Sequence, residues 1–124
     1  MGTPAIDEIR VRRATRRLEL DFADGTRASL PAEYLRVESP SAEIQGHGLG
    51  QKKTIPGKRD VNIAAVEPIG HYAIRIVFTD GHDTGLYSWD LLYQLTQEHE
   101  TRWAAYLAAL AAQSLTRDCG RLHN

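Results

Sequence analysis

The fold is decided by a stretch near the middle of the chain, Ala73–Leu95, which reads A-I-R-I-V-F-T-D-G-H-D-T-G-L-Y-S-W-D-L-L-Y-Q-L. Ile74, Ile76 and Phe78 recur at every second position, and this period predicts a strand with one face on a core. The Asp-Gly pair that follows predicts a hairpin with a primed turn, in which both central residues have positive φ. Ser88 is a good helix N-cap, so a second short strand should lead directly into a helix.

A similar pattern occurs earlier in the chain, over Leu18–Leu35, which reads L-E-L-D-F-A-D-G-T-R-A-S-L-P-A-E-Y-L. It aligns with Ile74–Leu91 at a constant separation of 56 positions. The aligned pairs are Phe22 with Phe78, Asp24 with Asp80, Gly25 with Gly81, Leu30 with Leu86 and Leu35 with Leu91. Two interpretations stay open: a repeated β-hairpin-plus-helix unit, or two unrelated hairpins that share a turn sequence.

Two further strands are predicted outside the repeated segments. Ile9 and Val11 alternate with charged residues, which predicts a half-exposed strand after a loose terminus over residues 1–5. Alternation resumes over residues 61–65 and predicts a strand that precedes a turn at Pro68-Ile69-Gly70. The strands and helices together predict a two-layer α+β domain built from two pseudo-repeated units.

The rest of the chain is predicted to form a long connection and a long helix. Residues 37–60 are rich in glycine and show no period, which is typical of a functional or mobile loop. Apolar side chains at helical spacing predict a helix over about Gln97–Arg117, within residues 96–117, and residues 118–124 should fray. Ala105, Ala108 and Ala112 form the opposite side of this helix, either merely exposed or a shallow contact surface.

Composition excludes several classes of protein. The chain has 124 residues, a formal net charge of −1 and one cysteine, Cys119. A disulfide framework is therefore excluded, and no general attraction to nucleic acid or to an anionic membrane is expected. No apolar run approaches the length of a membrane span or a secretion signal, which favours a cytoplasmic location.

The connection carries basic residues among its glycines. Lys52, Lys53, Lys58 and Arg59 lie near Gly46–Gly50, but no G-x-x-x-x-G-K-[ST] spacing occurs, so nucleotide hydrolysis is rejected. Weak anion binding by the backbone amides and these cations stays open, and a solvated basic loop is the simpler interpretation.

Five histidines are present, and their spacing matches no metal motif. His82-Asp83 is the best local pair because groups just past a hairpin turn can point into solvent, and His47 in the connection is a second candidate. A nucleophile is poorly supported, since Cys119 lies in the predicted tail. Asp80 is best explained as a turn-forming residue.

Aromatic residues near the second hairpin are candidates for a recognition surface. Tyr87, Trp89 and Tyr93 follow each other from the second predicted strand into the helix. Core packing is the commoner role for Trp89, and Tyr87 is expected to be partly exposed.

Several motifs resemble one family. L-R-V-E-S-P-S-A-E begins at Leu35, G-K-R-D-V-N-I at Gly57, E-P-I-G-H-Y-A at Glu67 and F-T-D-G-H-D-T-G-L-Y-S-W-D-L-L at Phe78. The pattern D-G-H-x-[ST]-G-x-Y-S-W-D-x-L resembles a bacterial family of small proteins classed with the N-terminal domain of γ-butyrobetaine hydroxylase, and the resemblance covers residues 6–95. It implies an α+β domain. It does not imply oxygenase activity, because residues after Leu95 are too few for the catalytic jelly roll and no H-x-[DE] iron motif occurs.

The resemblance also implies a zinc site that this chain does not retain. The zinc-binding relatives carry three cysteines and a histidine, and their positions correspond here to Ser39, Ser41, Ile44 and His82. Two hydroxyls and an isoleucine cannot replace three thiolates, so no zinc site of that type is expected.

The favoured hypothesis is a non-enzymatic binding or adaptor module without a cofactor. Similar domains occur attached to P-loop ATPases that carry iron–sulfur clusters, so the resemblance implies a protein partner in cluster metabolism. The alternative is a small-molecule or metal-binding protein that uses His82, His47, Asp83 and the loop over residues 46–59. An enzyme in its own right is the least favoured hypothesis.

Overall fold

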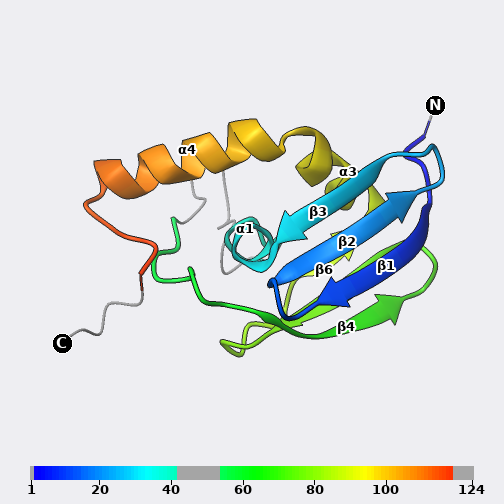
Figure 1. The fold of residues 1–124 in the computed structure, drawn as a ribbon, viewed down its shortest axis with the longest axis horizontal. Coiled ribbons are helices and arrows are strands. Elements are labelled where there is room, and N and C mark those ends of the chain that lie inside the picture. The colour runs from blue at the N-terminus through cyan, green and yellow to red at the C-terminus, as the bar shows by residue number, and fades with distance from the viewer. Residues whose placement is uncertain (1, 42–53, 119–124) are drawn as a thin grey trace.

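The computed structural model describes residues 2–41 and 54–118. Within them, two three-stranded antiparallel sheets are combined with three helices (Figure 1), so the predicted α+β class is confirmed. The elements are β1 (Ile6–Arg12), β2 (Arg17–Phe22), β3 (Arg27–Pro31), α1 (Ala32–Val37), β4 (Ile63–Ile69), β5 (Ala73–Phe78), β6 (Leu86–Ser88), α3 (Trp89–Gln97) and α4 (His99–Ala112).

The two sheets are built alike and confirm the predicted repeat. Each sheet has its strands in chain order, β1-β2-β3 and β4-β5-β6, and each is followed by a helix. The register of β1 on β2 shifts between Ile6 and Glu8, and that of β4 on β5 shifts between Ile63 and Ala65. A shared turn sequence does not produce matching bulges on a third strand, so the two units are a structural repeat.

The predicted alignment of the two units at a constant separation of 56 positions is wrong for the residues that follow the hairpin turns. Leu30 pairs with Leu18, whereas Tyr87 pairs with Ile74, so the counterpart of Leu30 is Tyr87, 57 positions later. The cause is one additional residue in the irregular segment between Gly81 and β6. Tyr87 is 0% exposed and Leu86 is 50% exposed, which contradicts the predicted partial exposure of Tyr87.

The hairpin turns also differ from the prediction. Gly25 and Gly81 have φ values of 92°, and neither preceding aspartate has positive φ, which excludes the primed turn. The Phe22 N–H donates to the Thr26 carbonyl at 2.8 Å, and the Gly25 N–H donates to the Phe22 carbonyl at 3.0 Å. The second hairpin has the same bonding. These are three-residue loops that close with a glycine in the left-handed region.

Two hydrophobic clusters occur among the described residues: a small one joins Val37 of α1 to Tyr106 and Leu110 of α4, and the main core lies between the sheets and helices. Both sheets and the helices α1 and α3 contribute buried side chains to a single cluster, and Trp89 packs against its edge. The main contributors are Leu18, Leu20, Phe22 and Leu30 from the first sheet, Ile63, Ile74, Ile76, Phe78 and Tyr87 from the second, and Tyr34, Leu35, Leu92 and Leu95 from the helices. The predicted cap is confirmed, because the Ser88 hydroxyl accepts from the Leu91 N–H at 3.1 Å.

The predicted long helix is shorter and is preceded by a separate one. The helix α3 ends at Gln97, and α4 ends at Ala112 instead of reaching Arg117. Ser114 has a φ of 56°, and the chain turns back so that the Gly57 N–H donates to the Thr116 carbonyl at 2.9 Å. In Figure 1 this returning segment, in red-orange, lies beside the green segment that follows residue 54.

Two further boundaries differ from the prediction. The strand β4 begins at Ile63 and continues through Pro68 and Ile69, so the turn lies at residues 70–72. Pro68 is tolerated because β4 is an edge strand. No helix in the described part of the chain combines the length and apolar character that crossing a membrane requires.

The corrected register can be tested with neighbouring substitutions. Tyr87→Ala should lower the free energy of unfolding by about 3–5 kcal/mol, because it removes a fully buried ring. Leu86→Ala should change it by less than about 0.5 kcal/mol, because Leu86 is half exposed. Urea denaturation monitored by circular dichroism measures both, and a larger loss in Leu86→Ala would contradict the register.

Candidate functional site

The Asp80 carboxylate joins three separate parts of the chain. Its Oδ2 accepts from Arg36 Nε of α1 at 2.8 Å and from Lys58 Nζ at 2.6 Å, and its Oδ1 accepts from the His82 backbone N–H at 3.0 Å. Burial raises the pKa of this carboxyl, but the hydrogen bonds from Lys58, His82 and Arg36 outweigh burial and hold the pKa at about 2. The prediction that Asp80 forms the turn is confirmed, and the structure adds its bonds to two cations.

The first unit has an equivalent of this arrangement. The Asp24 carboxylate accepts from the Thr26 N–H at 2.9 Å and from the Tyr93 hydroxyl of α3 at 3.1 Å. Arg36 and Tyr93 are 57 positions apart, which is the separation of the two helices. Each turn aspartate is therefore bound by the helix of the other unit.

His82 is buried and not directed into solvent, contrary to the prediction. Its Nε2 lies 2.8 Å from the Ser39 hydroxyl, and His82 and Ser39 are 8% and 0% exposed. The Ser41 N–H donates to the same hydroxyl at 3.3 Å. A Cβ at Gly85 would lie 2.6 Å from Ser39 Oγ, so the backbone of the irregular segment closes directly over this pair.

Some of the positions that correspond to zinc ligands in the relatives lie close together in this structure. The structure places Ser39, Ser41 and His82 side by side, and Ile44 lies outside the described residues. In residues 2–41 and 54–118, no group of three or more histidine, cysteine or carboxylate side chains is arranged to hold a metal ion. Ser39 is too deeply buried for its hydroxyl to attack a substrate.

The other predicted site residues are dispersed. Asp83 pairs with Arg75 at 3.3 Å, and Arg59 pairs with Asp118 at 2.5 Å. The Tyr87 hydroxyl donates to the Leu35 carbonyl inside the core at 2.6 Å.

Both described cations of the basic loop, Lys58 and Arg59, are therefore neutralised by carboxylates. His47 lies outside the described residues. The recognition surface expected around His82 is not assembled in the part of the chain that the structure describes.

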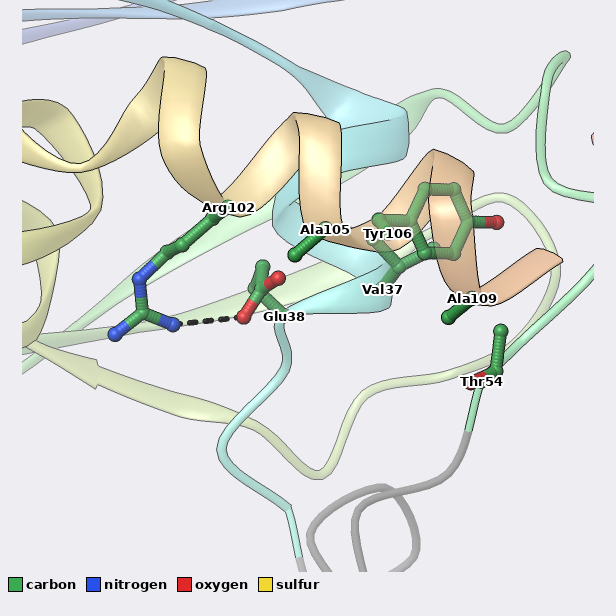
Figure 2. Close-up of a pocket in the computed structure, with 7 residues that line it drawn as sticks. All are labelled: Val37, Glu38, Thr54, Arg102, Ala105, Tyr106 and Ala109. Carbon is green, nitrogen blue, oxygen red and sulfur yellow. Dashed lines mark hydrogen bonds and ion pairs between the residues drawn. The ribbon is translucent and has the colours of Figure 1, made fainter. Parts of the chain in front are cut away.

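A pocket that the sequence did not indicate lies between α1 and α4 (Figure 2). It has a volume of about 230 Å³ and is lined by Val37, Glu38, Thr54, Arg102, Ala105, Tyr106 and Ala109. The alanines lie along α4, and Val37 ends α1. Ala105 belongs to the alanine-rich side of the predicted helix, whereas Ala108 and Ala112 of that side are not among the residues that line the pocket.

An ion pair borders one end of the pocket. Arg102 Nη1 donates to Glu38 Oε1 at 2.8 Å, and the Glu38 side chain is 3% exposed. Arg102 Nε donates to Glu98 Oε1 at 2.9 Å. At the other end, the Tyr106 hydroxyl donates to the Ile55 carbonyl, and burial raises the pKa of Tyr106 to about 12, so it stays a donor. The pocket therefore has an apolar wall of fixed shape between two polar ends.

The fold and this site describe an α+β domain of two pseudo-repeated units. A family model described as "Gamma-butyrobetaine hydroxylase-like, N-terminal" matches residues 9–93. The chain belongs to this family, as the sequence motifs predicted.

Solved structures agree with this assignment. Two chains described as NMR solution structures are 42% identical to this one, with TM-scores of 0.83 and 0.81; the alignments cover 98% and 99% of this chain and 95% of each relative. A crystal structure from Acidithiobacillus ferrooxidans, described as a protein of unknown function of the DUF971 family, is 38% identical, with a TM-score of 0.63, over 74% of this chain and 92% of that one. A comparison with curated proteins finds no match.

The role of Asp80 predicts a pH dependence. The pKa of Asp80 is about 2 in the folded protein, below its ordinary value of 3.8, so the unfolded chain takes up the proton first as the pH falls. The stabilising contribution is complete above about pH 5 and is lost as the pH falls towards 2. It amounts to about 1–2 kcal/mol, since each unit of pKa corresponds to about 1.4 kcal/mol before solvent screening.

Asp80→Asn should therefore lower the free energy of unfolding by about 1–2 kcal/mol at neutral pH, and the difference from the parent protein should narrow in acid. Urea denaturation at a series of pH values measures this. The matched control is Asp83→Asn, which alters a more exposed pair and should cost less than about 0.5 kcal/mol. A constant difference between pH 7 and pH 2 would contradict the role of Asp80.

The burial of His82 predicts that zinc does not bind there. Addition of stoichiometric zinc should leave the His82 imidazole signals unchanged in nuclear magnetic resonance spectra, because the Ser39 hydroxyl engages Nε2 and the described residues provide no group of metal-binding side chains there. The exposed His71 serves as an internal control for weak surface binding. A saturable shift at His82 would revive the metal-binding alternative.

Proposed function

We propose that the protein is a non-enzymatic binding module that docks a partner protein through the α1/α4 pocket. The pocket itself is the observation that supports this function. Its volume of about 230 Å³ is below the range of cofactor and metabolite sites, which is roughly 300–1,000 Å³. A pocket of this size suits one apolar side chain from a partner, which is the usual anchor of a protein interface.

The rim of the pocket supports a peptide ligand. Arg102 uses Nε and Nη1 for Glu98 and Glu38, and within the described residues its Nη2 has no hydrogen bond. This nitrogen can donate to a main-chain carbonyl beside the anchoring side chain. A neutral carbonyl suits the site better than a carboxylate, because two glutamates already surround the arginine.

The polar residues around Asp80 and His82 favour binding over catalysis. Arg36 and Lys58 both donate to the Asp80 carboxylate, so this carboxylate is engaged by cations, although Arg36 Nη1 has no hydrogen-bond partner among the described residues. Ser39 and His82 are buried against each other, whereas a catalytic group needs access to substrate. The family resemblance makes an iron–sulfur carrier ATPase in the cytoplasm the first partner to test.

The pocket can be tested by filling it. Ala109→Arg should weaken binding of a display-selected peptide with an apolar anchor by at least about tenfold, because the long side chain occupies the cavity. The matched control is Ala111→Arg, an exposed position about 200° away around α4, and it should stay within about twofold. Isothermal titration calorimetry measures both, after circular dichroism confirms that both variants are folded.

Peptides that bind the two arginine variants equally would contradict the docking site. The same pair of variants, tested against a purified iron–sulfur carrier ATPase, examines the identity of the partner. Loss of ATPase binding in Ala109→Arg alone would support it. Absence of ATPase binding to the parent protein would contradict this partner and leave the peptide result standing.

A further inference from the structure

A second surface lies on the other side of the molecule, between the edge strands β1 and β4. A groove of about 530 Å³ is lined by Ile9 and Val11 of β1, by Val66 and Pro68 of β4, and by Arg13. Both strands are at the edge of their sheets, so neither pairs with a further strand on that side in the described structure. In Figure 1, β4 lies below β1 at the lower right of the molecule.

The groove ends at an arginine-rich turn. Residues 10–17 read R-V-R-R-A-T-R-R, and Glu19 is the next acidic residue after them. Arg13 donates to the carbonyls of Ile63 and Ala64 at 3.1 and 2.8 Å, which fixes the turn against the start of β4.

The charges of this turn are largely not neutralised. Within the described residues, Arg13 and Arg17 form no ion pair, and the carboxylate that pairs with Arg16 is that of Asp60, at 3.8 Å with both side chains exposed. By contrast, Arg10 is surrounded by carboxylates, and Arg12 shares Glu19 with it. Positive charge therefore accumulates where the apolar groove ends.

We propose that this groove docks an extended segment of a partner protein, in which alternating apolar side chains are followed by carboxylates. Ile9 and Val11 are two positions apart on one face of β1, which corresponds to a spacing of ~7 Å, and Arg13 follows just beyond the end of the strand. An extended chain has the same period, and its apolar residues meet Ile9 and Val11 as its acidic end meets Arg13 and Arg16. Charge complementarity sets the direction of the segment.

A peptide fits this surface better than a nucleic acid does. A nucleic acid would use the arginines, but its phosphate backbone would leave the apolar side of the groove, including Val66 and Pro68, uncovered. Ile9 and Val11 are half-buried and reach the groove from an edge strand, and an edge strand beside an apolar groove is instead typical of strand addition. This surface is separate from the α1/α4 pocket, so the protein would hold two partners, or two parts of one partner, at once.

The test uses the full chain and synthetic peptides of about nine residues, which match the length of β1 with its turn. Two peptides alternate valine and threonine; one carries three glutamates at its N-terminal end and the other carries them at its C-terminal end. Each has a counterpart in which glutamines replace the glutamates. We expect one glutamate peptide to shift the amide signals of β1 and β4, with an affinity that falls as salt increases. The glutamine counterparts should bind at least about tenfold more weakly.

Arg16→Glu should weaken the glutamate peptide by at least about tenfold, because it reverses the charge at the end of the groove. Residue 16 has a φ of 57°, and glutamate, like arginine, has a Cβ, so the substitution does not change the backbone strain at this position. The matched control is Arg27→Glu, an exposed arginine of β3 outside the groove, which should stay within about twofold. Ala109→Arg should also leave the affinity for the glutamate peptide unchanged. That result would distinguish the β1/β4 groove from the α1/α4 pocket.

Four outcomes would overturn the proposal: no shifts in β1 and β4 with any peptide, equal binding of the glutamine peptides, full binding by Arg16→Glu, or tighter binding of a single-stranded oligonucleotide. The last result would assign the surface to nucleic acid. Pro68→Glu provides a second variant that leaves the arginines intact. It introduces a charge into the exposed wall of the groove and should also abolish peptide binding.

Discussion

The bond between a turn aspartate and the helix of the other unit is the constraint on which this structure depends. Asp80 is partly withdrawn from water, and a buried carboxylate is stable only when its charge is compensated. Arg36 from α1 and Lys58 from the connection provide that compensation. Asp24 and Tyr93 make the equivalent bond in the first unit, where the residues that the structure describes provide no charged partner for Asp24. The two units are thus tied reciprocally, and the charged tie also orders the segment around Lys58.

The differences between the units explain where binding surfaces can lie. The additional residue after Gly81 produces an irregular segment, which Gly85 allows to close over Ser39 and His82. The irregular segment is where the two units differ most, and it covers Ser39 and His82. These two residues therefore stabilise the fold. Pockets remain in two other places. One lies between α1 and the alanines of α4, and the other lies between the edge strands β1 and β4. The two proposed docking surfaces lie at these two places.

Sequence patterns predicted the local structure well. Period-two alternation located β2 and β5, Asp-Gly located both hairpin turns, and Ser88 located the start of α3. The family resemblance placed Ser39 and His82 at neighbouring positions, and the structure brings them within hydrogen-bond distance. The turn type was wrong because an Asp-Gly pair serves both two-residue and three-residue loops, and only the backbone bonds distinguish them.

The sequence alone therefore determined the class of fold and the family, because these depend on periodicity, turn chemistry and motifs within short segments. It suggested the repeat, and the matching register shifts of the two sheets decided it. Tertiary structure alone decided that Tyr87 is buried and Leu86 exposed, since one extra residue reverses the faces of a strand. It also decided the partners of Asp80 and both proposed docking surfaces. Such contacts join residues tens of positions apart, and no local pattern records which distant side chain completes a pocket or neutralises a charge.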